Sequence, residues 1–176
     1  FIGFHLSKKL LEKGNIVHGY DSMNNYYDVK LKKARYKILK KNKNFSFTKG
    51  KLENKKILEN IFNRFKPNIV IHLAAQAGVR YSIEKPRVYL DSNITGTYNI
   101  IEISKKLNVK HLIMASSSSV YGANKKIPFK EIDKTETQLS IYAATKKSNE
   151  SMAHSYSNIW KIPITMLRFF TVYGPW

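Results

Sequence analysis

Hydrophobic and polar positions along the chain follow two patterns in turn, one typical of amphipathic helices and one typical of short strands. Helical spacing covers residues 2–13, 28–41, 53–65, 86–107 and 142–160. Strand-like runs cover residues 15–20, 45–49, 68–75, 109–116 and 164–170. The regular alternation of the two predicts an α/β fold, a doubly wound parallel sheet.

The apolar run at 68–75 is continuous, which is typical of a parallel strand buried on both faces. Polar or small residues follow the ends of several strands: Asp21, Ala74 and Ala75, Ser116 and Ser117, and Thr171. Ligands of doubly wound sheets bind beyond the carboxyl ends of the strands. We therefore expect one shared cleft at these positions.

The chain is strongly basic, with 31 Lys and Arg against 12 Asp and Glu and a net charge of +19. The basic residues concentrate between Lys30 and Lys66. Such a patch suits nucleic acid or an anionic surface, or it is the solvated helix face of a protein rich in Lys, Asn and Ile. No nucleic-acid motif accompanies the charge, so we do not expect a nucleic-acid partner.

The sequence also argues against several other classes of protein. It has no Cys, which excludes a disulfide framework and a thiolate metal site. Its 5 histidines lack metal-ligand spacing, so we expect no metal. No apolar run is long enough to span a bilayer and no signal peptide is visible, so we expect a cytoplasmic protein without membrane contact.

Tyr142 and Lys146 are the first candidates for catalysis. Residues four apart share one face of a helix, and a phenol beside an ammonium loses its proton more easily. A serine run, 116–119, precedes Val-Tyr-Gly and offers a hydroxyl to the same substrate. This combination predicts a general base for an alcohol whose hydride passes to a nicotinamide cofactor. Alone the spacing is weak, because a helical tyrosine usually serves packing.

Several motifs occur together in one order. They are Phe1-Ile2-Gly3, which resembles the end of a Gly-x-x-Gly-x-x-Gly loop, then 72–80, 92–97, the serine run, 142–146 and 168–175. In this order they resemble the extended short-chain dehydrogenase/reductase family, with its NAD-dependent nucleotide-sugar epimerases and dehydratases. The segments 74–82, 121–124, 142–147 and 170–176 are most similar to the UDP-glucuronate 4-epimerase group.

The resemblance implies an NAD-binding Rossmann fold and a 4-epimerase that interconverts UDP-glucuronate and UDP-galacturonate through a 4-keto sugar. Tyr142 would take the proton from the sugar 4-hydroxyl while the hydride passes to NAD. Lys146 would bind the nicotinamide ribose and lower the phenol pKa. Ser117 matches the catalytic Ser or Thr of the family. Together they form the expected catalytic set.

The same resemblance assigns binding residues. For the cofactor these are Gly3, Asp21, Leu52, Leu73, Ala74, Ala75, Asn93, Lys146 and Phe170. Asp21 suits the ribose of NAD and would repel the extra phosphate of NADP, although an Asp before Ser22 also suits a turn. For the substrate they are Arg80, Ser117, Ser118 and Thr171. Arg80 is equally well explained as a solvent-facing loop residue.

Ser118 and Ser119 separate the activities within the family. Related 4,6-dehydratases carry an Asp-Glu pair there, and hydroxyls cannot replace its acid-base chemistry. They can donate hydrogen bonds to a sugar carboxylate, which favours a uronate. Two alternatives remain: a UDP-hexose 4-epimerase, and a catalytically silent module that binds NAD or RNA.

Other features depart from the family pattern. Lys51 stands where relatives have an Asp that pairs with adenine, which puts adenine affinity in doubt. By resemblance, the first strand and the C-terminal substrate domain lie outside the sequence, so residues 1–176 are an incomplete NAD-binding domain. We expect this piece alone to be inactive and poorly folded. In the parent protein, helices 87–107 and 142–160 resemble the pair that forms a homodimer.

Overall fold

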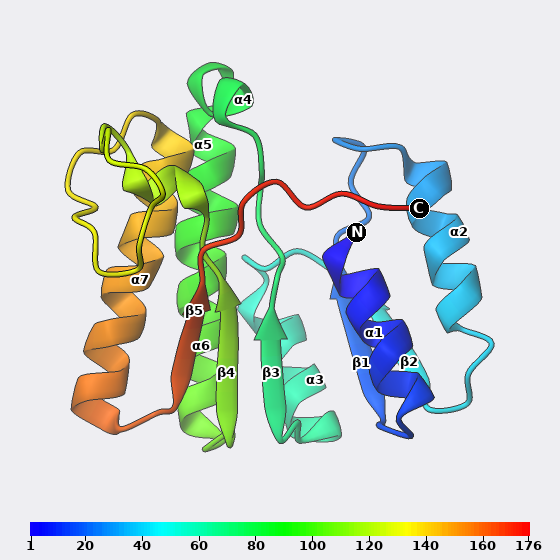
Figure 1. Ribbon diagram of the computed structural model, residues 1–176. Coiled ribbons are helices and arrows are strands. Elements are labelled where there is room, and N and C mark those ends of the chain that lie inside the picture. Colours follow the sequence, from blue (N-terminus) through cyan, green and yellow to red (C-terminus); the bar gives the residue numbers. More distant parts are fainter. The chain divides into compact units, whose positions relative to one another are not determined.

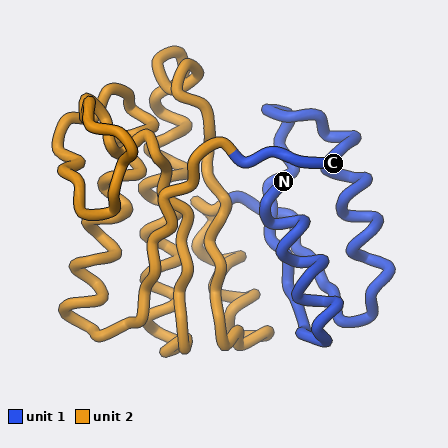
Figure 2. The backbone as a smooth tube through the Cα atoms, in the orientation of Figure 1, with its two compact units in different colours: residues 1–51, 172–176 blue, residues 52–171 orange.

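The computed structural model describes all residues, 1–176, and they form two compact units (Figure 2). The first unit comprises residues 1–51 and 172–176, and the second comprises residues 52–171. Each unit has its own sheet of parallel strands, one of two strands and one of three. The predicted α/β fold with parallel strands is confirmed. None of the helices is both long enough and apolar enough to cross a bilayer.

The first unit contains two helices and two parallel strands (Figure 1). In chain order these are α1 (Ile2–Glu12), β1 (Val17–Asp21), α2 (Val29–Leu39) and β2 (Phe45–Lys49). Its small core consists of Phe4, Leu11 and Leu39, with Val17 and Phe45 packed against them. The core therefore joins both helices to both strands.

The second unit contains the remaining elements. They are α3 (Lys55–Phe65), β3 (Ile69–His72), α4 (Val79–Glu84), α5 (Pro86–Tyr89), η1 (Leu90–Thr95), α6 (Gly96–Lys106), β4 (His111–Ala115), η2 (Ser118–Tyr121), α7 (Ile141–Trp160) and β5 (Ile164–Leu167). The strand order is β3-β4-β5, and α3, α6 and α7 pack side by side against this sheet (Figure 1). Because its strands are parallel, their carboxyl ends meet at one edge.

Side-chain caps explain where three helices begin. Asp28 accepts a hydrogen bond from the Lys30 amide, Asn54 from Ile57 and Ser140 from Ala143. Each cap satisfies an amide that has no partner within its helix. The predicted helix starts at 28, 53 and 142 consequently fall within two residues of the observed ones.

The helix predicted over 86–107 is continuous but irregular. Its middle segment, η1, is a π-helix, and such segments often occur at functional sites. Asn93 lies within it. Gly96 follows directly, and a Cβ at this position would collide with the side chain of Leu52. Glycine is thus required where residue 52 packs closely on the helix.

One prediction for the second unit is wrong. The run at 68–75 forms a strand only over 69–72, and this strand is not buried on both faces, because Ile69 is 54% exposed. The reason is its place in the sheet: β3 pairs with β4 alone and is an edge strand. The short helix α4 and the 3-10 turn η2 had not been predicted either.

Candidate active site

Helix α7 carries Tyr142 and Lys146 in its first two turns. Ser140 caps the helix, since its hydroxyl accepts a hydrogen bond from the Ala143 amide at 3.1 Å. Tyr142 is half-buried, whereas Lys146 is buried. Spacing by four residues directs both side chains from the same face of the helix. The sequence prediction of a shared face is therefore supported by the helix itself.

Lys146 fastens α7 to the end of strand β4. Its ammonium donates a hydrogen bond of 2.7 Å to the carbonyl oxygen of Ala115, two residues before Ser117. Burial disfavours the charged form and lowers the pKa of Lys146 to about 8. At pH 7 the group is therefore still mostly an ammonium. Two of its three N–H donors remain for other partners.

Ser117 lies in the turn that follows β4. Its backbone is extended, and its hydroxyl accepts a hydrogen bond from the Ser119 amide at 3.1 Å. The Ser118 amide donates to the carbonyl oxygen of Phe169 at 2.8 Å, which holds the turn against the segment after β5. Gly122 ends the turn with a φ of +55°, and a Cβ there would collide with the Thr137 carbonyl oxygen. Only glycine fits this position without strain.

The ring of Tyr142 packs on Tyr89, with the ring centroids 6.2 Å apart in an edge-to-face arrangement. Tyr89 is fully buried, and its hydroxyl lies 2.7 Å from the carbonyl oxygen of Ala77. The chain from β3 to α4 thus helps to fix the position of Tyr142. Sequence reasoning had not identified this contact.

A cavity of about 200 Å³ lies between the turn at residues 116–119 (the serine turn) and the beginning of α7. Its lining comprises Val79, Ser118, Ser119, Tyr121, Gly122, Phe129, Leu139, Ser140 and Ala143. Three of the nine residues are serines and none is acidic. Ser118 directly follows Ser117, and Ala143 directly follows Tyr142, so this cavity is the candidate sugar site although the catalytic candidates themselves do not line it.

Asn93 holds the surrounding elements together. It is fully buried, and its amide oxygen accepts a hydrogen bond from the Gln76 amide at 2.8 Å. Its amide nitrogen donates to the Gln76 carbonyl and to the Thr145 hydroxyl, each at 3.1 Å. All three contacts are within the protein, so Asn93 joins η1, the segment after β3 and α7. Its predicted contact with a cofactor stays a prediction.

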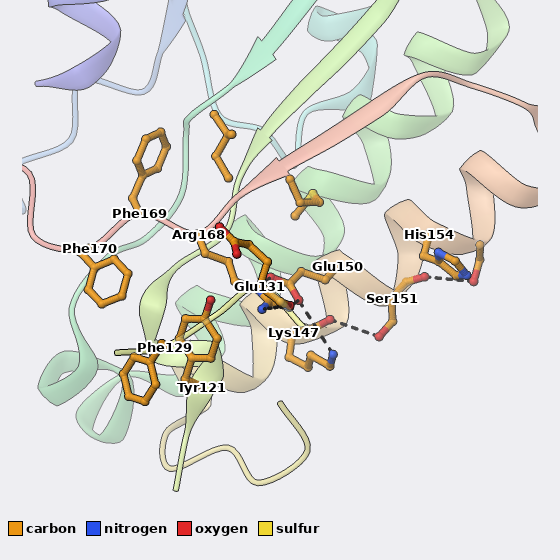
Figure 3. Close-up of a pocket in the computed structure, with 13 residues that line it drawn as sticks. Tyr121, Phe129, Glu131, Lys147, Glu150, Ser151, His154, Arg168, Phe169 and Phe170 are labelled. Atoms are coloured by element: carbon orange, nitrogen blue, oxygen red, sulfur yellow. Dashed lines mark hydrogen bonds and ion pairs between the residues drawn. The ribbon is translucent and has the colours of Figure 1, made fainter. Parts of the chain in front are cut away.

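A larger cavity of about 840 Å³ lies along another face of α7, beside β5 (Figure 3). Glu150 and Arg168 form its charged wall, and Tyr121, Phe129 and Phe170 form an aromatic one (Figure 3). The Tyr121 and Phe129 rings stack with centroids 4.5 Å apart. Neither cavity is lined by Ser117, Tyr142 or Lys146 themselves. The smaller one is lined by their chain neighbours Ser118 and Ala143, so we assign the chemistry to its side of the serine run.

The predicted cofactor residues divide between the two units. Gly3 lies in the first turn of α1, and Asp21 ends β1, where its carboxylate accepts a hydrogen bond from the Met23 amide at 2.6 Å. This hydrogen bond stabilises a turn after β1, and a turn was the alternative role that the sequence suggested for Asp21. In the second unit, Leu73, Ala74 and Ala75 follow β3 and are half-buried.

The other predicted contacts differ in exposure. Leu52 is buried against Gly96, which leaves little of its surface for a ligand. Phe170 is 59% exposed, and Thr171 is exposed beside it. Arg80 is exposed on α4, in agreement with the solvent-facing alternative. The structure brings Ser118 to the small cavity, but neither Arg80 nor Thr171 lines it.

Two polar groups had been missed, the half-buried Glu150 and the buried His72. Glu150, one turn beyond Lys146, binds Ser116 and Arg168, and its spacing of four from Lys146 could have revealed it. His72 lies 3.0 Å from the Thr97 hydroxyl through Nε2, and burial, with a smaller effect of the Lys146 charge, lowers the pKa of His72 to about 3. This histidine is therefore neutral. No group of three or more His, Cys, Asp or Glu could hold a metal ion.

Comparison with known proteins gives a consistent result. A chain 51% identical over 176 residues is the probable UDP-glucuronate 4-epimerase of Rhizobium meliloti (strain 1021); the match covers 100% of this chain and 52% of that protein. The UDP-glucuronic acid 4-epimerase from Bacillus cereus, solved with UDP-glucuronic acid and NAD, is 36% identical with a TM-score of 0.88. That match covers 99% of this chain and 55% of the other.

A second solved structure has the same TM-score and a slightly lower sequence identity. The UDP-glucose 4-epimerase from Thermotoga maritima, solved with UDP-glucose, is 32% identical with a TM-score of 0.88, and the match covers 99% of this chain and 54% of the other. The chain thus spans about half the length of the curated relatives it matches. The family model described as GDP-mannose 4,6 dehydratase matches residues 1–176. The chain belongs to this family, the NAD-dependent epimerases and dehydratases of the extended short-chain dehydrogenase/reductase type.

Proposed function

We propose that the complete protein is an NAD-dependent nucleotide-sugar 4-epimerase that interconverts UDP-glucuronate and UDP-galacturonate through a 4-keto sugar. The proposal rests on one observation. The hydrogen bond from Lys146 to the carbonyl of Ala115 connects helix α7, which contains Tyr142, to strand β4, which leads into the serine turn. A phenol, a buried ammonium and a serine hydroxyl are thereby held by adjoining elements. The names of the similar proteins from Rhizobium meliloti and Bacillus cereus support the same activity.

The available donors and acceptors fit the ribose groups of NAD. Lys146 uses one N–H on Ala115 and can offer others to ribose hydroxyls. The Asp21 carboxylate accepts one amide hydrogen bond through Oδ1 and has further lone pairs for hydroxyl donors. Gly3, in the first turn of α1, lies where helix amides favour a phosphate. When bound, NAD would supply the reversible acceptance of hydride from the sugar C4.

The protein's own residues would manage the proton. Tyr142 takes the proton from the sugar 4-hydroxyl and returns it to the same oxygen when the hydride comes back to the other face of the keto carbon, as general acid-base catalysis requires. The Ser117 hydroxyl holds the same sugar oxygen. Tyr89 keeps the Tyr142 ring in place through its edge-to-face contact.

The lining of the small cavity supports a uronate substrate. Ser118, Ser119 and Ser140 provide hydroxyl donors and no carboxylate there would repel a charged sugar. Thr171, predicted as a further hydroxyl for the sugar, does not line this cavity. The same two positions, Ser118 and Ser119, lack the acid-base pair that a 4,6-dehydratase needs, although the family model carries a dehydratase name.

A homodimer of the complete protein, formed through α6 and α7, belongs to this proposal. Tyr98 and Trp160 are 43% and 48% exposed on these helices, and aromatic residues of this kind favour interfaces. Analytical ultracentrifugation of the complete protein tests the dimer.

A direct assay tests the function. The complete protein is incubated with UDP-glucuronate or with UDP-glucose, and the sugar products are separated by chromatography. We expect UDP-galacturonate from the first and little or no conversion of the second. Conversion of UDP-glucose alone would instead establish the hexose epimerase alternative. Absence of any conversion, together with absence of NAD binding, would reject the proposal.

A further inference from the structure

We propose that Glu150 is a positioning residue for catalysis, because it closes a ring of contacts that sets the serine turn at a fixed place relative to Tyr142 and Lys146. This inference rests on the proposed function, since it concerns the same site. Glu150 follows Lys146 by four residues on α7, but it lines the larger cavity instead of the sugar cavity (Figure 3). Its effect on catalysis would therefore be exerted through other residues.

The Glu150 carboxylate binds two elements at once. Its Oε1 atom accepts a hydrogen bond from the Ser116 hydroxyl at 2.6 Å and one from Arg168 Nε at 2.9 Å. Its Oε2 atom accepts a second hydrogen bond from Arg168 at 3.0 Å. A bidentate pair of this kind fixes orientation as well as distance. One side chain of α7 thus binds both the turn after β4 and the end of β5.

Backbone hydrogen bonds complete the ring. The Ser116 amide donates to the Leu167 carbonyl and the Ser118 amide to the Phe169 carbonyl, each at 2.8 Å. Arg168 lies between those two acceptors, and Ser117 lies between the two donors. The segment that holds Ser117 on both sides is consequently itself held by Glu150. On the helix side, Lys146 binds Ala115, the residue before Ser116, so consecutive turns of α7 hold consecutive residues of the chain.

The electrostatics agree with a permanently charged pair. Burial raises the pKa of Glu150, but hydrogen bonds from Arg168 and Ser116 outweigh it, and the net pKa is lowered. The hydrogen bond to Glu150 raises the pKa of Arg168 further above its usual range. The side chains are 11% and 20% exposed, so water competes weakly for the pair. Its geometry is therefore kept at the pH of catalysis.

Loss of the ring should displace Ser117 relative to Tyr142 without removing any group that touches the sugar. A misplacement of about 1 Å can cost roughly 100-fold in rate when reacting groups must be aligned. Substrate affinity, which depends on the whole nucleotide sugar, should change little. The expected signature is a fall in kcat with KM nearly unchanged.

The test compares four forms of the complete enzyme with NAD: wild type, Glu150→Gln, Ser116→Ala and the control Glu131→Gln. The Glu150 variant keeps its shape but turns an amide donor toward Arg168, whereas the Ser116 variant removes a single bond from the ring. Glu131 lines the same cavity and meets Arg168 through its backbone carbonyl only, which the substitution keeps. We expect kcat to fall about 10-fold to 100-fold in Glu150→Gln and less in Ser116→Ala. KM, NAD affinity and the Glu131 variant should stay within about twofold of wild type.

Hydrogen exchange of the Ser118 amide provides a readout that does not depend on activity. Exchange should be faster in Glu150→Gln than in wild type and Glu131→Gln, because Arg168 no longer holds the Phe169 acceptor. If Glu150→Gln does not fold, Ser116→Ala decides the question. Unchanged kcat per NAD-binding site, or unchanged exchange at Ser118, would overturn the inference. A wild-type protein that is inactive on every UDP-sugar would reject the proposed function. The exchange measurement would still show whether Glu150 holds the Ser118 amide in place.

Discussion

Replacement of Lys146 by Met should make the NAD-free protein more stable at neutral pH while it destroys activity. The ammonium is buried, and its pKa falls from 10.5 to about 8 on folding. At about 1.4 kcal/mol per pKa unit, this shift means that the charged Lys146 lowers the free energy of unfolding by about 3 kcal/mol. Methionine has a similar length and no charge, so it avoids this cost. Against the gain stands the carbonyl of Ala115, which loses its donor at a cost of about 1–3 kcal/mol.

The pH dependence makes this prediction specific. The folded pKa is lowered, so between pH 8 and 10.5 the unfolded wild type binds more protons than the folded one, and wild-type stability rises with pH. Below pH 8 the cost of Lys146 is fully present, and above 10.5 it vanishes. The advantage of Lys146→Met should therefore shrink by roughly 2–3 kcal/mol between pH 7 and pH 10. The variant should become less stable than wild type at the upper end.

Urea denaturation of the complete, NAD-free protein at pH 7 and pH 10 measures the difference between the two forms. Lys147→Met is the matched control, since Lys147 is the next residue of α7 and its side chain is 35% exposed. Its substitution should shift stability by less than about 1 kcal/mol, equally at both pH values. Two results would refute the argument from burial. One is a Lys146→Met variant that is several kcal/mol less stable than wild type at pH 7. The other is a difference in stability between the two forms that is the same at both pH values.

Three further predictions follow from the site. Tyr142→Phe should lower kcat by roughly 10²–10⁴-fold, because the proton acceptor is lost, and calorimetry should find NAD binding nearly intact; near-normal turnover would exclude Tyr142 as the base. Gly122→Ala should lower the free energy of unfolding by about 2–4 kcal/mol, because a positive φ and a collision with the Thr137 carbonyl oppose a Cβ; an unchanged urea midpoint would contradict this. Asp21→Ala in the complete protein should weaken NAD binding by about tenfold, because a charged hydrogen bond to ribose is lost. An unchanged affinity by calorimetry would mean that Asp21 serves only to stabilise its turn.

Much of the local structure could be predicted because it depends on neighbouring residues. The caps Asp28, Asn54 and Ser140 act within their own first turns, so the helix starts were visible in the sequence. The spacing of Tyr142 and Lys146 fixed their common face for the same reason. Motif order also indicated the family before any tertiary contact was known.

The exposure of β3 could not be predicted from its apolar sequence alone. Whether Ile69 is covered depends on which strands flank it, and in the structure it has β4 on one side only. The hydrophobic pattern of a sequence indicates which residues favour burial, whereas their actual burial depends on which other elements cover them. The same limit applies to Leu52, whose close contact depends on the missing Cβ of Gly96.

The sequence by itself determined the α/β class, the approximate positions of the main helices and strands, and the set of candidate catalytic residues. Tertiary structure decided how these residues are held: Lys146 on Ala115, Asn93 between Gln76 and Thr145, and Glu150 between Ser116 and Arg168. These partners are 17 to 52 positions apart in the chain. Periodicity and capping arise from residues within a turn or two of each other, but a buried polar group takes whichever partner the packing brings within 3 Å.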